Sequence, residues 1–73
     1  SNQLYRIKAT VDTEALSSAV NQFKEKYGRF PSDLSQLVRA GFIKEVPKDL
    51  DGNDYLYDPK TGEVKAPRVW WKR

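Results

Sequence analysis

The first twenty-seven residues of the chain carry apolar side chains at helical spacing. From Leu4 onward the intervals are three and four residues, which predicts one apolar stripe along an α-helix. The members of this stripe are Leu4, Ile7, Val11, Ala15, Leu16, Ala19, Val20, Phe23 and Tyr27. Gly28 follows at once and suits a left-handed C-terminal cap. We therefore predict a single helix from about Gln3 to Tyr27.

A second, shorter helix is predicted after Pro31. Ser32 is the expected N-cap, and Asp33 would lie in the first turn, near the positive end of the helix dipole. Gly41 is expected to end this helix. Its buried side is predicted to consist of Leu34, Leu37 and Val38.

Two short segments with strand character follow, at residues 55–57 and 63–65. Between them, Pro59 presets φ for a type I turn and Gly62 can adopt the left-handed conformation of a bulge. Residues 69–71 form a possible third strand. The order of long helix, short helix and antiparallel meander of two to three strands predicts one α+β domain over residues 1–73.

The acidic segment between the second helix and the hairpin partly follows the pattern of a calcium loop. Asp49, Asp51 and Asn53 stand at alternate positions, as the first three ligands of an EF-hand do. However, Asp54 occupies the glycine position and Lys60 the position of the bidentate glutamate. The pattern favours a turn, with an irregular calcium site left open whose ligands would be Asp49, Asp51, Asn53 and Asp58. The four aspartates of this exposed segment are expected to titrate normally and to form no catalytic pair: Asp49, Asp51, Asp54 and Asp58.

The composition excludes several classes of metal site and catalytic site. The 73 residues include no cysteine and no histidine, which excludes disulfides, thiolate and imidazole metal ligands, and Ser-His or Cys-His catalysis. A chain of this length buries only about 60% of the surface that it exposes when unfolded, so a deep catalytic cleft is not expected. We predict no enzymatic activity, no cofactor and no metal site.

The basic and aromatic residues at the end of the chain raise the question of nucleic-acid binding, although the formal net charge is only +3. Adjacent side chains of a strand point to opposite faces, so one tryptophan would pack in the core and the other would be exposed. Packing against the helix is the favoured interpretation, and nucleic acid is not expected as a partner. The candidate residues for contact with a partner or with nucleic acid are Arg68, Trp70, Trp71, Lys72 and Arg73.

The predicted first helix is long for so small a domain. Its length of roughly 37 Å, at 1.5 Å per residue, exceeds what short strands and a two-turn helix can cover. Its N-terminal part is therefore expected to protrude, with Leu4, Ile7 and Val11 as assembly contacts beyond the domain. The residues predicted to hold the sheet and the second helix to the first helix are Phe30, Leu34, Leu37, Phe42, Tyr55 and Tyr57.

Residues 15–66 resemble the soluble domain of pseudopilins of type II secretion systems, and of type IV pilin-like proteins generally. The resemblance lies in YGRFP after the first helix, PKDLDGNDYLY after the second, and the turn DPKTG. Leu50 replaces the usual proline of this family and Asp51 the usual aromatic residue. The C-terminal calcium loop of the major pseudopilins has no counterpart here, so no metal site is carried over.

The resemblance implies a non-enzymatic subunit of a pilus-like or pseudopilus fibre. Its globular domain would face the periplasm of a bacterial cell envelope, anchored before assembly in the inner membrane by a preceding hydrophobic helix. Ser1-Asn2 suggests that the sequence was excised from such a longer chain. The implied partners are copies of itself, other pilin-like subunits and the secretion or pilus assembly machinery. The alternatives are a C-terminal binding module of a larger periplasmic, tetratricopeptide-like protein and a weakly nucleic-acid-binding pilin.

Overall fold

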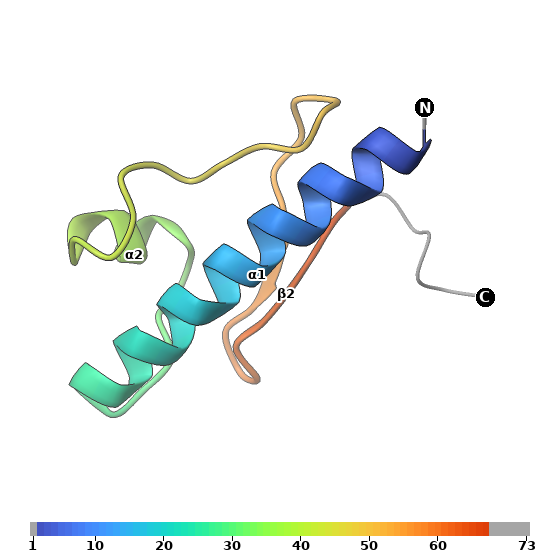
Figure 1. Ribbon diagram of the computed structural model, residues 1–73. Helices are drawn as coiled ribbons and strands as arrows, with labels where there is room; N and C mark the ends of the chain where they lie inside the picture. Colours follow the sequence, from blue (N-terminus) through green and yellow to red (C-terminus); the bar gives the residue numbers. More distant parts are fainter. Residues whose placement is uncertain (1, 68–73) are drawn as a thin grey trace.

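The computed structural model describes residues 2–67 and has the predicted α+β composition. Two helices, α1 (Asn2–Tyr27) and α2 (Ser35–Arg39), precede an antiparallel hairpin of β1 (Leu56–Asp58) and β2 (Glu63–Lys65). Figure 1 shows α1 crossing the whole molecule, with the hairpin against one side of it and α2 beside its C-terminal half. The possible third strand at residues 69–71 lies outside the described residues.

The long first helix is confirmed as one unbroken element. It ends as predicted, because Gly28 has φ 77° and donates its backbone N–H to the carbonyl oxygen of Lys24 at 2.7 Å. This is the single hydrogen bond of a left-handed C-terminal cap. Neither helix of the described part of the chain has a stretch apolar enough, over sufficient length, to cross a bilayer.

The prediction of a single apolar stripe on α1 is wrong. The buried stripe begins with Tyr5 and Ala9, which were not predicted, and its full membership is Tyr5, Ala9, Leu16, Ala19, Val20 and Phe23. Leu4, Ile7 and Val11 lie about 140° from this stripe around the helix axis, at about 100° per residue, and are exposed. Ala15 and Tyr27 are exposed as well. The helix thus has two apolar faces in its N-terminal half.

The second helix begins two residues later than predicted, because its N-cap is Leu34. It starts at Ser35, and Ser32 is not its N-cap. Instead the Asp33 carboxylate accepts hydrogen bonds from the Ser35 hydroxyl at 2.6 Å and the Gln36 backbone N–H at 3.1 Å. These bonds lower the pKa of Asp33, because they stabilise its ionised form. Gly41 terminates α2 as predicted, with φ 85°.

The hairpin matches the prediction closely. β2 has the predicted bounds, β1 is shifted by one residue, and Tyr57 pairs with Val64 across the ladder. In the connecting turn Gly62 has φ 76° and donates its N–H to the Asp58 carbonyl oxygen at 2.7 Å. The Asp58 carboxylate accepts the N–H of Lys60 at 2.9 Å, which is an Asx turn. Local turn chemistry therefore sets the register of the two strands.

The core fills the space between α1, α2 and the hairpin. Of the six residues predicted to hold these elements together, Leu34, Leu37 and Tyr55 are buried. The other three are half-buried and pack against the core: Phe30, Phe42 and Tyr57. The remaining buried apolar residues outside α1, among those that the structure describes, are Pro31, Val64 and Ala66.

Candidate functional site

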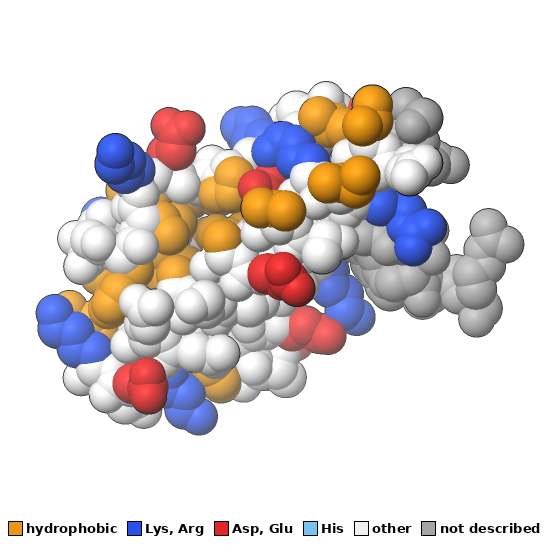
Figure 2. Space-filling model, viewed as in Figure 1, with side chains coloured by type: hydrophobic (Ala, Val, Ile, Leu, Met, Phe, Trp, Pro, Cys, Tyr) orange, Lys and Arg blue, Asp and Glu red, His pale blue; other side chains and the backbone are white. Residues whose placement is uncertain are grey.

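The second apolar face of α1 is the first candidate surface. Leu4, Ile7 and Val11 expose 62%, 55% and 60% of their surface, although each is a large aliphatic residue. In Figure 2, apolar side chains stand out over the N-terminal part of α1, with basic side chains beside them. A shallow hollow adjoins this face and is lined by Gln3, Arg6, Ile7, Thr10 and Val11. The structure thus places the three predicted assembly contacts together on one accessible face.

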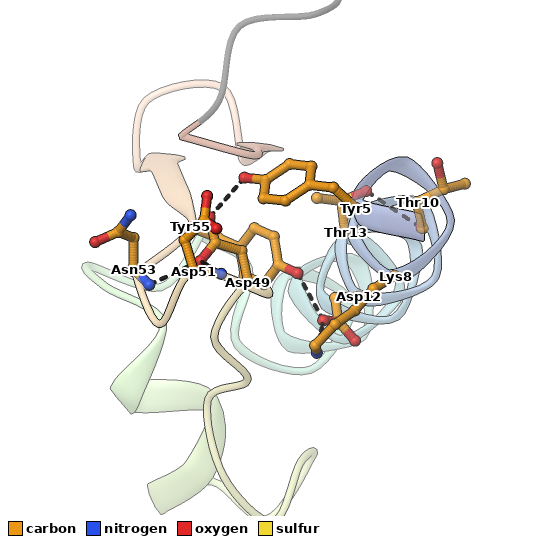
Figure 3. Close-up of polar contacts among 9 residues, drawn as sticks. All are labelled: Tyr5, Lys8, Thr10, Asp12, Thr13, Asp49, Asp51, Asn53 and Tyr55. Atoms are coloured by element: carbon orange, nitrogen blue, oxygen red, sulfur yellow. Dashed lines mark hydrogen bonds and ion pairs between the residues drawn. The ribbon is translucent and has the colours of Figure 1, made fainter. Parts of the chain in front are cut away.

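The opposite face of the same helical turns is covered by the chain's own acidic loop. Tyr5, only 2% exposed, donates its hydroxyl to Oδ2 of Asp49 at 2.6 Å (Figure 3). The two residues are 44 positions apart in the sequence. The prediction that the N-terminal part of α1 protrudes free of the body is therefore wrong, because one side of it is packed and hydrogen-bonded. Only the side with the exposed aliphatic residues is uncovered by the described residues.

Asp49 organises the loop that makes this contact. It is only 5% exposed, and its Oδ1 accepts the backbone N–H groups of Asp51 at 3.0 Å and Asn53 at 2.7 Å. Its own backbone N–H donates to the Asn53 carbonyl oxygen at 3.0 Å. The expectation that all the loop acids are solvated is wrong for Asp49. A carboxylate is suited to this position because both of its oxygens can accept several donors at once.

In a second tyrosine–aspartate contact, the tyrosine comes from the loop and the aspartate from α1. Tyr55, in the segment before β1, donates its hydroxyl to Oδ2 of Asp12 on α1 at 2.6 Å, and Lys8 Nζ lies 2.6 Å from the same oxygen. Burial raises the pKa of the Tyr55 hydroxyl above its usual range, and the adjacent Asp12 carboxylate raises it further. A tyrosine hydroxyl keeps its proton at neutral pH, and the raised pKa lets Tyr55 remain a donor at higher pH as well.

The two contacts form a reciprocal tyrosine–aspartate clasp, which consists of Tyr5, Asp12, Asp49 and Tyr55. Helix α1 supplies one tyrosine and one aspartate seven residues apart, which is two turns along one face. The acidic loop supplies the matching pair, and Figure 3 shows the two hydrogen bonds side by side. The clasp fixes the rotation of α1 about its own axis. Consequently it also fixes the direction in which Leu4, Ile7 and Val11 face.

Sequence reasoning missed Tyr5 and the clasp. A signal was present, because Tyr5 continues the series of Ala9, Leu16 and Phe23 at helical spacing. Leu4, Ile7 and Val11 fit the same spacing rule. Because they are aliphatic, they were assigned to the apolar stripe in place of Tyr5 and Ala9, which the structure buries. Hydropathy alone ranks leucine and isoleucine above tyrosine, whereas the structure buries the residue whose hydroxyl finds a partner.

Among the described residues, the acidic loop has no cluster of side chains that could hold a metal ion. No group of three or more acidic side chains converges there. The Asp49 and Asp58 carboxylates accept hydrogen bonds inside their own turns, and Asp54 pairs with Lys48 at 2.6 Å. The interpretation of this segment as a turn agrees with these contacts. The predicted contact residues Arg68, Trp70, Trp71, Lys72 and Arg73 lie outside the described residues.

Comparisons with protein-family models, with curated proteins and with solved structures gave no match for this chain.

Proposed function

We propose that this chain is a non-enzymatic structural subunit of a pilus-like or type II secretion pseudopilus fibre. Its globular body would face the periplasm, and its partners would be copies of itself, other pilin-like subunits and the assembly machinery. In this proposal the chain is anchored in the inner membrane before assembly by a segment that precedes the described residues. No catalytic step is assigned to it.

The observation that carries the proposal is the exposed aliphatic face of α1. Isolated exposed aliphatic residues are common on soluble domains, but here three of them share one face of an unbroken helix of 26 residues. Contacts of one face with a different surface of the next copy build an open filament wherever the rotation between copies does not close into a ring. The resemblance of residues 15–66 to pseudopilins supports the same interpretation from the sequence side.

The clasp also supports this proposal, because it holds α1 at a fixed rotation relative to the globular body. A helix that transmits contacts along a fibre must keep a fixed rotation relative to its globular body. Two hydrogen bonds between side chains more than 40 residues apart in the sequence, Tyr5 to Asp49 and Tyr55 to Asp12, hold α1 in this way. The globular body would then lie on the outside of the fibre, while the aliphatic face contacts the neighbouring subunit.

Photo-cross-linking in the cells that produce the protein tests the proposal. Val11 is replaced in the full-length chain by the photoreactive amino acid p-benzoylphenylalanine, and the adducts formed on irradiation are identified by mass spectrometry. We expect the main adduct to join two copies of this chain, or this chain and another pilin-like subunit. The same replacement at Lys60, exposed in the hairpin turn, is the control and should give less of this adduct.

Two outcomes would contradict the proposal. Cross-links from position 11 that stay within one larger polypeptide would favour the alternative of a binding module. Equal adducts from positions 11 and 60 would show that the aliphatic face has no special role in assembly.

A further inference from the structure

A second surface, at the far end of α1, has a different chemistry. A shallow hollow of about 370 Å³ lies between the C-terminal end of α1 and α2 and is lined by Phe23, Tyr27, Arg29, Gln36, Arg39 and Ala40. Its apolar part includes two rings in contact, since the centroids of Phe23 and Tyr27 lie 4.6 Å apart, with the ring planes tilted by 45°. Tyr27 is 47% exposed, so its ring is accessible to a partner. The hollow thus offers an aromatic surface at its base.

The polar groups around this surface are hydrogen-bond donors. The guanidinium of Arg29 lies 5.5 Å above the Phe23 ring and has no ion pair with any described residue. Gln36 uses its Oε1 to accept the Ser32 N–H at 2.8 Å, which leaves its NH2 group without a partner among residues 2–67. Arg39 lies 3.9 Å from Asp33 at the edge of the hollow and is largely exposed. No carboxylate lines the hollow itself.

Further cations surround the same end of the molecule. Lys26 Nζ lies 5.4 Å from the Tyr27 ring and 6.0 Å from the Phe42 ring, and Lys24 Nζ lies 4.5 Å from the Phe30 ring. Basic side chains project from this end in Figure 2 as well. An anion that enters the hollow would therefore meet a positive field and planar guanidinium donors over an apolar base.

We propose that this hollow binds an acidic segment of a protein partner. A carboxylate of that segment is held by Arg29 and Arg39, and an adjacent apolar or aromatic side chain packs on the Tyr27 ring. Guanidinium groups suit this role because their planar donors match a carboxylate in pairs. The inference goes beyond the proposed function, since the hollow lies at the opposite end of α1 from the aliphatic face.

The local charges favour a protein segment over a nucleic acid. Glu25 is exposed between Lys24 and Lys26, and Asp33 borders the hollow beside Arg39. A continuous phosphate backbone would pass close to these two carboxylates and be repelled, whereas a peptide can place one carboxylate between Arg29 and Arg39 and keep its other charged groups away from them. A hollow of about 370 Å³ holds one or two side chains, whereas a nucleic acid strand would need a continuous groove.

An NMR titration of the 73-residue chain tests the inference. The probe is the peptide acetyl-Glu-Glu-Phe-Glu-Glu-amide at low ionic strength, and its glutamine counterpart is the neutral control. We expect the acidic peptide to shift the backbone amide signals of Phe23, Tyr27, Arg29 and Ala40. The glutamine peptide should bind at least about tenfold more weakly, since charge-assisted hydrogen bonds are roughly twice as strong as neutral ones.

A pair of variants separates a specific site from general attraction. Arg29→Gln should weaken binding of the acidic peptide by about fivefold or more, while Arg6→Gln removes the same charge from the N-terminal half of α1 and should change it less than about twofold. Melting temperatures of both variants show whether each is folded. Equal losses for the two variants, equal binding of both peptides, or no shift at these residues would overturn the inference.

Two further probes decide the class of ligand. Inorganic phosphate should bind more weakly than the acidic peptide, because it lacks the apolar side chain. Tighter binding of a short oligothymidylate at the same residues would show that the ligand is a nucleic acid and would overturn the assignment. None of these outcomes changes the test at position 11, so failure of this inference and failure of the proposed function can be told apart.

Discussion

Replacement of Gly62 by alanine is expected to lower the free energy of unfolding by about 2 to 4 kcal/mol. Gly62 has φ 76°, a conformation that L side chains rarely adopt, and this alone costs about 1 kcal/mol. A Cβ atom at this position would also lie 2.5 Å from Cε1 and 2.7 Å from Cδ1 of Phe30. The Phe30 ring must therefore move away from the hairpin turn, and its packing on the core is lost.

The chain contains a closely matched control. Gly28 has φ 77°, and a Cβ atom built there meets nothing within 4 Å. Gly28→Ala should therefore show only the conformational cost of about 1 kcal/mol in urea denaturation. In a background with Phe30→Ala, the cost of Gly62→Ala should fall to about the same value, because the clash has gone. Equal costs for Gly62→Ala and Gly28→Ala in the parent chain would contradict the proposed contact.

Replacement of Asp49 by alanine is expected to cost about 2 to 4 kcal/mol. The change removes the acceptor of three hydrogen bonds, from the Tyr5 hydroxyl and the backbone N–H groups of Asp51 and Asn53. The Tyr5 hydroxyl is buried, so it loses a partner that water cannot easily replace. The loop also loses the side chain around which it turns.

Two variants show whether the loss belongs to the clasp. Tyr5→Phe keeps the buried ring and removes one donor, so it should cost about 1 to 2 kcal/mol. Asp54→Ala removes a carboxylate from the same loop, but its ion pair with Lys48 is exposed and should contribute less than about 1 kcal/mol. Thermal or urea denaturation measures all three variants. If Asp49→Ala and Asp54→Ala were equally mild, Asp49 would not organise the loop.

The parts of the fold that could be predicted from the sequence are those set by local chemistry. The end of α1 at Gly28, the end of α2 at Gly41 and the turn at Gly62 all follow from positions where only glycine adopts positive φ without strain. The hairpin strands follow from alternation on either side of a proline-containing turn. Such signals span a few residues and do not depend on what packs against them.

The parts that could not be predicted depend on tertiary partners. The start of α2 depends on which oxygen reaches the first-turn donors, and Asp33 reaches them while Ser32 does not. The rotation of α1 depends on Asp49, which lies 44 residues from Tyr5 and whose burial no local pattern indicates. Because both stripes of α1 satisfy helical spacing, only the position of the loop decides which one is buried.

The most direct test of the account is the combined variant Leu4→Gln, Ile7→Gln and Val11→Gln in the full-length chain. Glutamine forms helices about as well as leucine, so the substitutions remove apolar surface without breaking α1. The account predicts a melting temperature of the domain within about 10 °C of the parent, because each surface substitution usually changes stability by no more than about 0.5 kcal/mol. It also predicts loss of assembly into the fibre. Assembly at the parental level, or a domain that no longer folds, would contradict the claim that this face of α1 serves contacts between subunits.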